Sequence, residues 1–197
     1  RKRLIRLVSA KHPETVLDIA TGTGDLALAF GKTQAKKIVG LDISPGMLEV
    51  GRKKVSRQAL DSKIDMVLGD SEALEFPEAS FDAVTVAFGV RNFENLEKGL
   101  SEIYRVLKPG GTLAILETSV PEKQPFKLGY HLHGKYLLPF FGRLFSRQGT
   151  AYSYLSESAA AFPYGPAFNN ILRKIGFIGM KHEPQTFGVA TIYTATK

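Results

Sequence analysis

The stretch Val16-Leu17-Asp18-Ile19-Ala20-Thr21-Gly22-Thr23-Gly24-Asp25 tells most about the fold of this 197-residue chain. It reads as a short apolar strand that runs into a glycine-rich turn, and Leu26 to Phe30 continue as a helix. Strand, glycine turn and helix in this order form the entry to a nucleotide-binding βαβ unit, in which the backbone approaches the ligand closely. The spacing Gly22-x-Gly24-x-x-Ala27 also fits a loose dinucleotide fingerprint, which alone identifies no ligand.

Two acidic residues border this turn, because Asp18 stands where the strand ends and Asp25 directly follows the glycines. A diphosphate bound there would meet both carboxylates, which is electrostatically unfavourable. S-adenosylmethionine (SAM) has a sulfonium, an ammonium and no phosphate, so the acids favour SAM over a dinucleotide. We therefore predict that Asp18, Gly22 and Gly24 belong to a SAM site, with S-adenosylhomocysteine as the product.

Two later apolar runs also end in acids. Asp42 lies 19 residues beyond Thr23, close to the spacing at which a carboxylate accepts from a ribose hydroxyl pair in such folds. The alternative role is a helix N-cap, although Ser44-Pro45 already supplies that signal. Asp70-Ser71 suits recognition of an adenine edge, and the alternative there is an Asx turn that closes the strand.

Apolar strand patterns alternate with helical patterns along most of the chain, which indicates a doubly wound parallel sheet. Ligands of such sheets lie over the carboxyl ends of the strands. Five candidate segments fall at those ends: Asp18–Gly24, Asp42, Asp70, Ala87–Arg91 and Glu117. We predict an α/β, Rossmann-like, mostly parallel seven-stranded sheet with helices on both faces and an antiparallel C-terminal hairpin strand. A helix is expected from Asn92 to Val106.

Composition sets further bounds. The length predicts a single domain over 1–197, and no window is apolar enough to suggest a membrane span. Without a cysteine, disulfides, thiolate metal sites and a cysteine nucleophile are excluded; no metal site is predicted, and a cytoplasmic location is expected. Because the chain opens with Arg1 rather than Met, we expect that its natural start is missing. The net charge of +7 serves solubility or attracts an anionic partner such as lipid or RNA.

Residues 121–170 differ in character from the rest, because aromatic and basic residues are interleaved there. This pattern suits a helical lid over an apolar substrate, or a surface that rests among lipid headgroups. The alternative is a helical pair packed on its own domain.

The chain resembles the C-methyltransferases of ubiquinone and menaquinone biosynthesis over essentially its whole length. Three stretches carry the resemblance: Leu17–Asp25, Phe88-Gly89-Val90-Arg91-Asn92 and Arg105–Ser119. The resemblance implies that Thr23, Asp42, Asp70 and Ser71 contact SAM. The chain departs from the family where Asp70-Ser71 replaces the common Asn-Ala and where Ala87 replaces a frequent Ser. The family's Tyr-Asp…Asn segment would lie upstream of Arg1.

The resemblance also implies an acceptor, a ring carbon of a polyprenyl quinol lipid. Demethylmenaquinol would give menaquinol, and the equivalent benzoquinol of ubiquinone synthesis stays open. Arg91 would stabilise the developing oxyanion or orient a water, and His131 and His133 are the alternative bases. The protein would touch the inner face of the membrane peripherally, and a homodimer is allowed for.

Two alternatives are a nucleic-acid methyltransferase and a non-catalytic SAM-binding subunit of a quinone-synthesis complex. Nucleic acid is disfavoured as a partner, because the chain has no cysteine to attack a pyrimidine and no Asn/Asp-Pro-Pro-aromatic run after its fourth strand.

Overall fold

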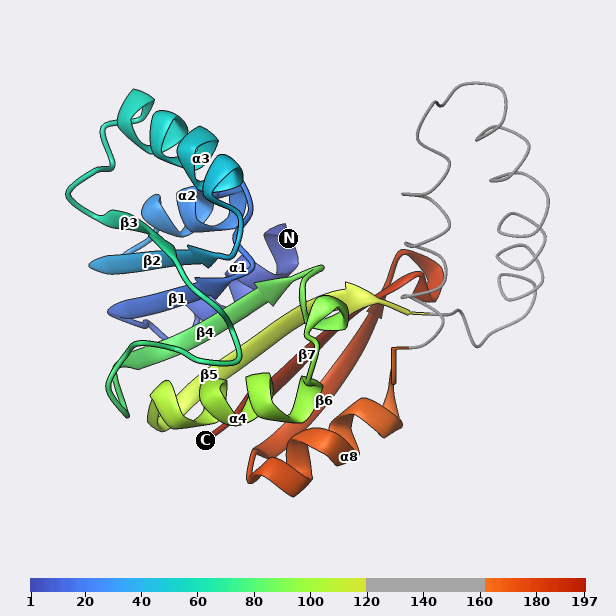
Figure 1. Ribbon diagram of the computed structural model, residues 1–197. Helices are drawn as coiled ribbons and strands as arrows, with labels where there is room; N and C mark the ends of the chain where they lie inside the picture. Colours follow the sequence, from blue (N-terminus) through green and yellow to red (C-terminus); the bar gives the residue numbers. More distant parts are fainter. Residues whose placement is uncertain (120–161) are drawn as a thin grey trace.

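The computed structural model describes residues 1–119 and 162–197, which form a seven-stranded sheet in the order β3-β2-β1-β4-β5-β7-β6 (Figure 1). The strands are β1 Thr15–Ile19, β2 Lys37–Asp42, β3 Ile64–Leu68, β4 Phe81–Ala87, β5 Leu107–Thr118, β6 Ile178–Gln185 and β7 Ala190–Thr196. Neighbours among β1 to β5 pair in parallel, whereas β7 pairs antiparallel with both β5 and β6. The predicted mostly parallel sheet with an antiparallel C-terminal hairpin strand is confirmed.

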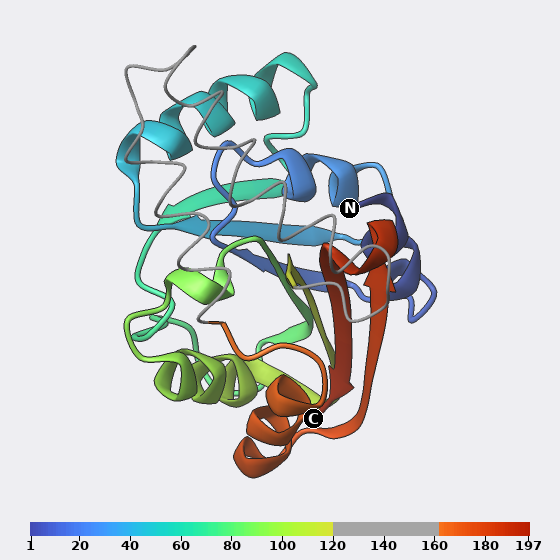
Figure 2. The ribbon, with the colours of Figure 1, turned by 90° about the vertical axis from the view of Figure 1, so that its right-hand side faces the viewer.

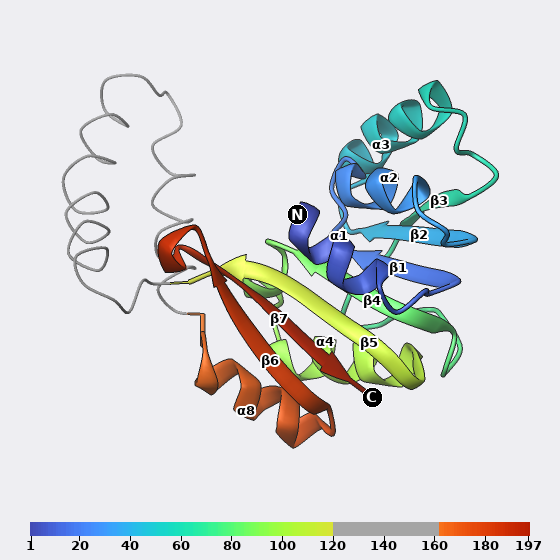
Figure 3. The same ribbon diagram turned by 180° about the vertical axis from the view of Figure 1, so that it is seen from behind.

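Helices cover both faces of this sheet. The helices are α1 Lys2–Ser9, α2 Asp25–Gly31, α3 Pro45–Arg57, α4 Leu96–Val106 and α8 Pro166–Ile175, with short 3₁₀ turns η1 Val90–Asn92 and η3 Thr186–Gly188. The sheet separates α2 and α3 from α4 and α8 in Figure 2, and α1 lies on the α2 side in Figure 3. Each side has its own apolar core, as expected when a parallel sheet is buried on both faces.

Local capping determines where two helices begin. Ser44 Oγ accepts from the Met47 amide at the start of α3, and Asn95 Oδ1 accepts from the Lys98 amide at the start of α4. The prediction that a helix opens at Asn92 is therefore wrong at its start, because Val90–Asn92 form a separate 3₁₀ turn and the chain is capped only at Asn95.

The crossover from β3 to β4, residues 69–80, contains no helix, so its backbone groups need partners elsewhere. Two side chains of α4 supply them. Arg105 donates to the carbonyls of Leu74 and Phe76 at 2.8 and 2.7 Å, and Glu102 accepts from the Leu74 amide at 2.9 Å. The bonds to Arg105 lower the pKa of Glu102 and keep it charged. This pair thereby fixes the loop that carries Asp70 and Ser71.

Most of the predicted lid over 121–170 falls outside the described residues, which resume at Phe162. Within residues 1–119 and 162–197, no helix has the length and apolar character needed to cross a bilayer.

Candidate functional site

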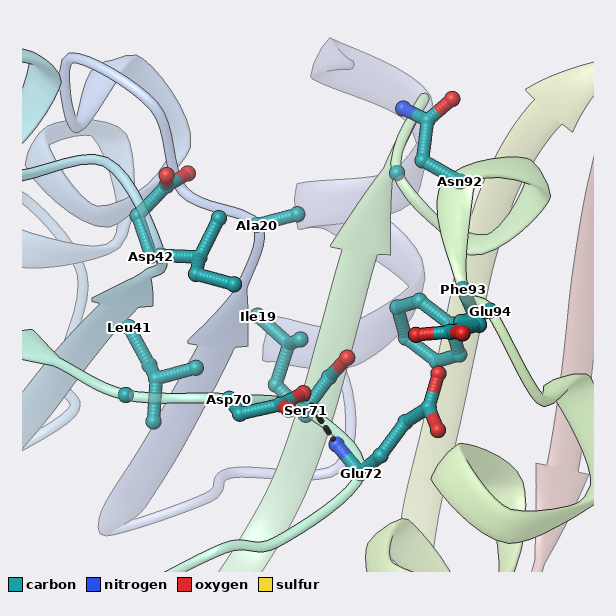
Figure 4. Close-up of a pocket in the computed structure, with 13 residues that line it drawn as sticks. Ile19, Ala20, Leu41, Asp42, Asp70, Ser71, Glu72, Asn92, Phe93 and Glu94 are labelled. Atoms are coloured by element: carbon teal, nitrogen blue, oxygen red, sulfur yellow. Dashed lines mark hydrogen bonds between the residues drawn. The ribbon is translucent and has the colours of Figure 1, made fainter.

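Two cavities lie at the carboxyl ends of the parallel strands, and Ala20 lines both. The larger one, about 310 Å³, is lined by Ile19, Ala20, Leu41, Asp42, Ile43, Gly69, Asp70, Ser71, Glu72, Gly89, Asn92, Phe93 and Glu94 (Figure 4). The smaller one, about 220 Å³, surrounds the glycine-rich turn from Ala20 to Asp25. This is the edge at which ligands of open α/β sheets bind.

The glycine-rich turn has a backbone that other residues rarely adopt. Gly22 and Gly24 have φ of +59° and +77°, and Ala20 shares the left-handed region at +53°. A Cβ added at Gly22 would meet no atom of the described residues within 4 Å, so they leave the space beside Gly22 open to a ligand. A non-glycine residue held at positive φ beside a cavity is typical of a functional site.

Asp42 is not the N-cap of α3, which was the alternative to ribose binding, because Ser44 holds that position. Asp42 Oδ2 accepts from the Gly22 amide at 2.8 Å, and its Oδ1 accepts from the Ser44 amide at 2.9 Å. Each carboxylate oxygen can accept more than one hydrogen bond, so Asp42 can organise the turn and still face a ligand. Ser44 supplies the helix cap, and Asp42 lines the larger cavity.

Asp70 and Ser71 also line the larger cavity, opposite Asn92–Glu94 in Figure 4. The Asx turn is present, because Asp70 Oδ1 accepts from the Glu72 amide at 2.8 Å. The turn therefore places both side chains at the cavity instead of excluding them from it.

Asp18 lies beneath the turn and is only 1% exposed. Its side-chain partners are two hydroxyls, Thr21 Oγ1 at 2.6 Å and Thr85 Oγ1 at 2.8 Å, and the second bond follows from the pairing of Asp18 with Thr85 between β1 and β4. Burial raises the pKa of Asp18 to about 6, against the opposing effects of the two hydroxyls, of Arg1 and of a hydrogen bond from the Ala27 backbone.

Thr23 lines the smaller cavity and is held by a lysine of α3. Lys54 Nζ donates to Thr23 Oγ1 and to Asp25 Oδ1, both at 2.7 Å. The glycine-rich turn is thereby tied to α3 as well as to β2.

Arg91 and Glu117 form a buried ion pair at the ends of β4 and β5, with side chains 11% and 0% exposed. Arg91 Nη1 lies 2.6 Å from Glu117 Oε1 and donates to the Phe88 carbonyl at 2.9 Å. Its Nε is buried and has no hydrogen-bond partner among residues 1–119 and 162–197. Arg91 does not line the two cavities described above, and His131 and His133 lie outside the described residues.

Sequence reasoning missed the apolar wall of the larger cavity. Ile43 lines this cavity and is 74% exposed, and Phe93 lines the same cavity. An exposed apolar residue directly after a strand-ending acid, as Ile43 follows Asp42, is the signal that was available. Such walls suit the faces of a flat ring.

The charges at the two cavities fit SAM and oppose a diphosphate. The charged residues of the larger cavity are all acids: Asp42, Asp70, Glu72 and Glu94. A carboxylate-lined cavity can accept from ribose hydroxyls and from an adenine amino group, whereas it repels phosphate. No cluster of three metal-ligating side chains occurs in the part of the chain that the structure describes.

This sheet order, with an acidic, glycine-lined site at its carboxyl edge, defines a Rossmann-like SAM-dependent methyltransferase. The chain belongs to the ubiE/COQ5 methyltransferase family, whose model matches residues 1–197. The predicted family, enzyme class and SAM cofactor are thereby confirmed.

Curated relatives match over the entire chain. A demethylmenaquinone methyltransferase of Bacteroides fragilis is 45% identical, and the match spans 81% of that protein. A protein of the same name from Thermus thermophilus is 43% identical over 89% of its length. A ubiquinone/menaquinone biosynthesis C-methyltransferase of Geobacter sulfurreducens is 43% identical over 77% of its length.

Solved structures share the fold at low identity. A SAM-dependent methyltransferase from Aquifex aeolicus has a TM-score of 0.63 at 19% identity, and the match covers 93% of this chain and 81% of that one. A phosphoethanolamine N-methyltransferase of Haemonchus contortus, bound to S-adenosylhomocysteine, has a TM-score of 0.72 at 18% identity. That match covers 100% of this chain and 52% of the other.

Proposed function

We propose that this protein transfers a methyl group from SAM to a ring carbon of demethylmenaquinol and releases menaquinol. The supporting observation is the family match over residues 1–197, together with full-chain relatives of this name at 45% and 43% identity. The Geobacter relative is named for both quinones, so the equivalent polyprenyl benzoquinol is the second acceptor to test.

The larger cavity would hold the adenosine part of SAM. Asp42 would accept from the ribose hydroxyls with the lone pairs that its two backbone bonds leave. Asp70 and Ser71 would bind the adenine edge, and Ile43 would cover a ring face. The turn with Asp18, Gly22, Thr23 and Gly24 would hold the methionine part in the smaller cavity.

Bound SAM supplies an electrophilic methyl group on its sulfonium. The quinol ring carbon becomes nucleophilic when a neighbouring phenol loses its proton. A bond would then form between this carbon and the methyl carbon while the carbon–sulfur bond breaks, with S-adenosylhomocysteine as the leaving group. The ring carbon would finally give up its own proton, and the phenolate oxygen would take a proton back, which restores the quinol. Positioning of the two carbons supplies much of the rate in such a transfer.

Arg91 would stabilise the phenolate oxygen or orient a water. Its guanidinium is fixed by Glu117 and the Phe88 carbonyl, and this rigidity favours preorganised electrostatic stabilisation. Because Glu117 offsets part of its charge, Arg91 would act mainly through its remaining N–H donors. His131 and His133 are the candidate bases for the two proton losses.

The quinol is a lipid, so we also propose peripheral contact with the inner face of the membrane and a cytoplasmic location. The net charge of +7 suits anionic headgroups. Sedimentation with anionic and neutral vesicles, with and without the quinol, would test the contact. We also propose a homodimer, which light scattering would test. Nucleic acid is not proposed as a partner.

An acceptor panel tests the function. The protein is incubated with SAM and, in separate reactions, with chemically reduced demethylmenaquinone, the reduced ubiquinone precursor and total RNA. Methylation of reduced demethylmenaquinone alone supports the proposal. Methylation of the reduced ubiquinone precursor alone would show that the protein acts in ubiquinone synthesis instead. SAM binding with no methylation in any reaction would favour a non-catalytic subunit instead.

A further inference from the structure

The turn η3 between β6 and β7 presents an aromatic side chain at the surface. Phe187 is 70% exposed and Val189 is 40% exposed. The turn lies at the carboxyl edge of the sheet, because Ala190 at the start of β7 pairs with Thr118 at the end of β5. Figures 1 and 3 show it, in red, beyond the arrowheads of β4 and β5. The exposed phenyl ring is therefore at the same edge of the sheet as the two cavities.

The backbone of this turn is strained. Thr186, Phe187 and Gly188 have φ of +47°, +59° and +94°, and a bulky side chain such as phenylalanine rarely occurs in this left-handed region. Such strain persists only where the surrounding structure enforces it, and it is typical of functional positions. Glycine or asparagine would relieve it. An exposed phenylalanine at this position is therefore not explained by stability.

Ser119, directly after β5, holds the turn in place. Its amide donates to the Val189 carbonyl at 2.9 Å, and its Oγ donates to the Gly188 carbonyl at 2.8 Å. The Val189 amide donates to the Thr186 carbonyl at 3.2 Å. Because these backbone groups already have partners within the protein, the turn can leave water without losing their hydrogen bonds.

The helix α1 begins near this turn and carries basic charges only. Lys2, Arg3 and Arg6 are exposed, and the helix contains no acid. Arg3 lies 3.1 Å from Glu183 of β6, the only acid among residues 162–197, so the start of α1 is close to the hairpin. Figure 2 shows the N-terminus and the turn next to each other on the face toward the viewer. The described surface around the turn is therefore both apolar and positive.

We propose that η3 inserts Phe187 and Val189 into the headgroup region of an anionic lipid bilayer, while Lys2 and Arg6 bind its phosphate groups. This inference rests on the proposed function, in which the acceptor is a lipid, and it assigns the membrane contact to one surface. Apolar side chains at the headgroup boundary and cations near anionic lipids both stabilise such binding. A symmetric dimer through this surface would bring the cations of two α1 helices together, so a bilayer fits better than a second copy.

A fluorescent reporter tests the insertion. The chain contains no tryptophan, so Phe187→Trp places a single one at the turn. Ile178→Trp is the matched control, because Ile178 is 62% exposed and lies at the opposite end of β6. Both variants are mixed with vesicles of phosphatidylglycerol and phosphatidylcholine in equal parts, with and without brominated acyl chains, and without SAM or quinol. For Phe187→Trp we expect blue-shifted emission that the brominated chains quench, and for Ile178→Trp we expect neither change.

Sedimentation with the same vesicles measures how much each group contributes. Phe187→Ser should bind about tenfold or more weakly, as expected for the loss of one buried phenylalanine side chain. Lys2→Gln should bind about fivefold more weakly to these vesicles, and its binding to pure phosphatidylcholine should not change. Lys174→Gln is the control, because Lys174 is an exposed lysine of α8 on the other face of the sheet, and it should bind as the parent does.

Three results would overturn the proposal: no binding to the anionic vesicles, unquenched emission from vesicle-bound Phe187→Trp, or an emission shift that follows protein concentration instead of lipid, which would indicate a second copy. Because SAM and quinol are absent, a protein that docks in this way but methylates no quinol would refute the proposed function alone. A protein that methylates a short-chain quinol in solution, while the reporter stays outside the bilayer, would refute the docking surface alone.

Discussion

Replacement of Asp18 by Asn should make the protein more stable at pH 8 and less able to bind SAM. Burial raises the pKa of Asp18 to about 6 from 3.8, so the folded state holds this proton more tightly than the unfolded state. Between these two values the folded protein binds more protons, and the carboxylate's contribution to stability therefore falls as the pH rises. Above the folded pKa, the buried ionised carboxylate lowers the free energy of unfolding by a constant amount, and a neutral amide does not.

The size of this penalty follows from the shift. About two pKa units correspond to roughly 3 kcal/mol of unfolding free energy at pH 8. Asn keeps one oxygen for the hydroxyls of Thr21 and Thr85, so one of these bonds is lost at a cost of about 1 kcal/mol. The free energy of unfolding of the Asn variant should therefore be about 2 kcal/mol above that of the parent at pH 8. Near pH 3.5 it should be about 1 kcal/mol below that of the parent.

Urea unfolding of both proteins between pH 3.5 and 8 measures this difference, from which all other titrating groups cancel. Asp61→Asn, at an exposed acid, is the control and should show a flat difference. A difference for Asp18→Asn that does not change with pH, or that favours the parent at high pH, would refute the reasoning. Calorimetry at pH 8 should also show weaker SAM binding by the stabilised variant, a trade-off common at functional sites.

Three further predictions concern packing and positioning. Gly89→Ala should lower the free energy of unfolding by about 1–3 kcal/mol, because its Cβ would lie 2.4 Å from the Cβ of Ala20, which the backbone holds in place. Gly46→Ala, with no described atom within 4 Å, should change this free energy by less than about 0.5 kcal/mol, and equal effects in urea unfolding would contradict this packing. Glu117→Ala should lower the free energy of unfolding by about 3–5 kcal/mol, because the guanidinium of Arg91 would stay buried without its carboxylate. A loss below about 1 kcal/mol would show that this pair is not buried in solution. Lys54→Met should weaken SAM binding several-fold, because the bond from Lys54 to Thr23 of the glycine-rich turn is lost. Lys53→Met, at an exposed lysine, is the control and should bind SAM as the parent does. Unchanged affinity in Lys54→Met would show that Lys54 does not position the turn.

Much of the site was predictable because strand ends carry a local signal. An apolar run that ends in an acid predicts both a buried strand and a carboxylate at the ligand edge, and Asp18, Asp42 and Asp70 all lie there. The antiparallel closing strand was likewise predicted, as part of a C-terminal hairpin.

Other features depend on contacts between distant segments. Arg91 pairs with Glu117 across two strands, and no local pattern announces that partner. The start of α4 was misplaced because Asn92 and Asn95 are both good capping residues, and tertiary packing selects the second. Likewise, no local pattern indicates that Asp42 accepts from the amides of both Gly22 and Ser44, because Gly22 belongs to the turn after another strand.

The most direct test of the proposed chemistry uses SAM with a trideuteriated methyl group and chemically reduced demethylmenaquinone. Mass spectrometry and NMR of the extracted quinone should show one trideuteriomethyl group on the ring carbon. Label on a quinol oxygen, or unlabelled quinone from a protein that binds SAM, would contradict C-methylation by this protein.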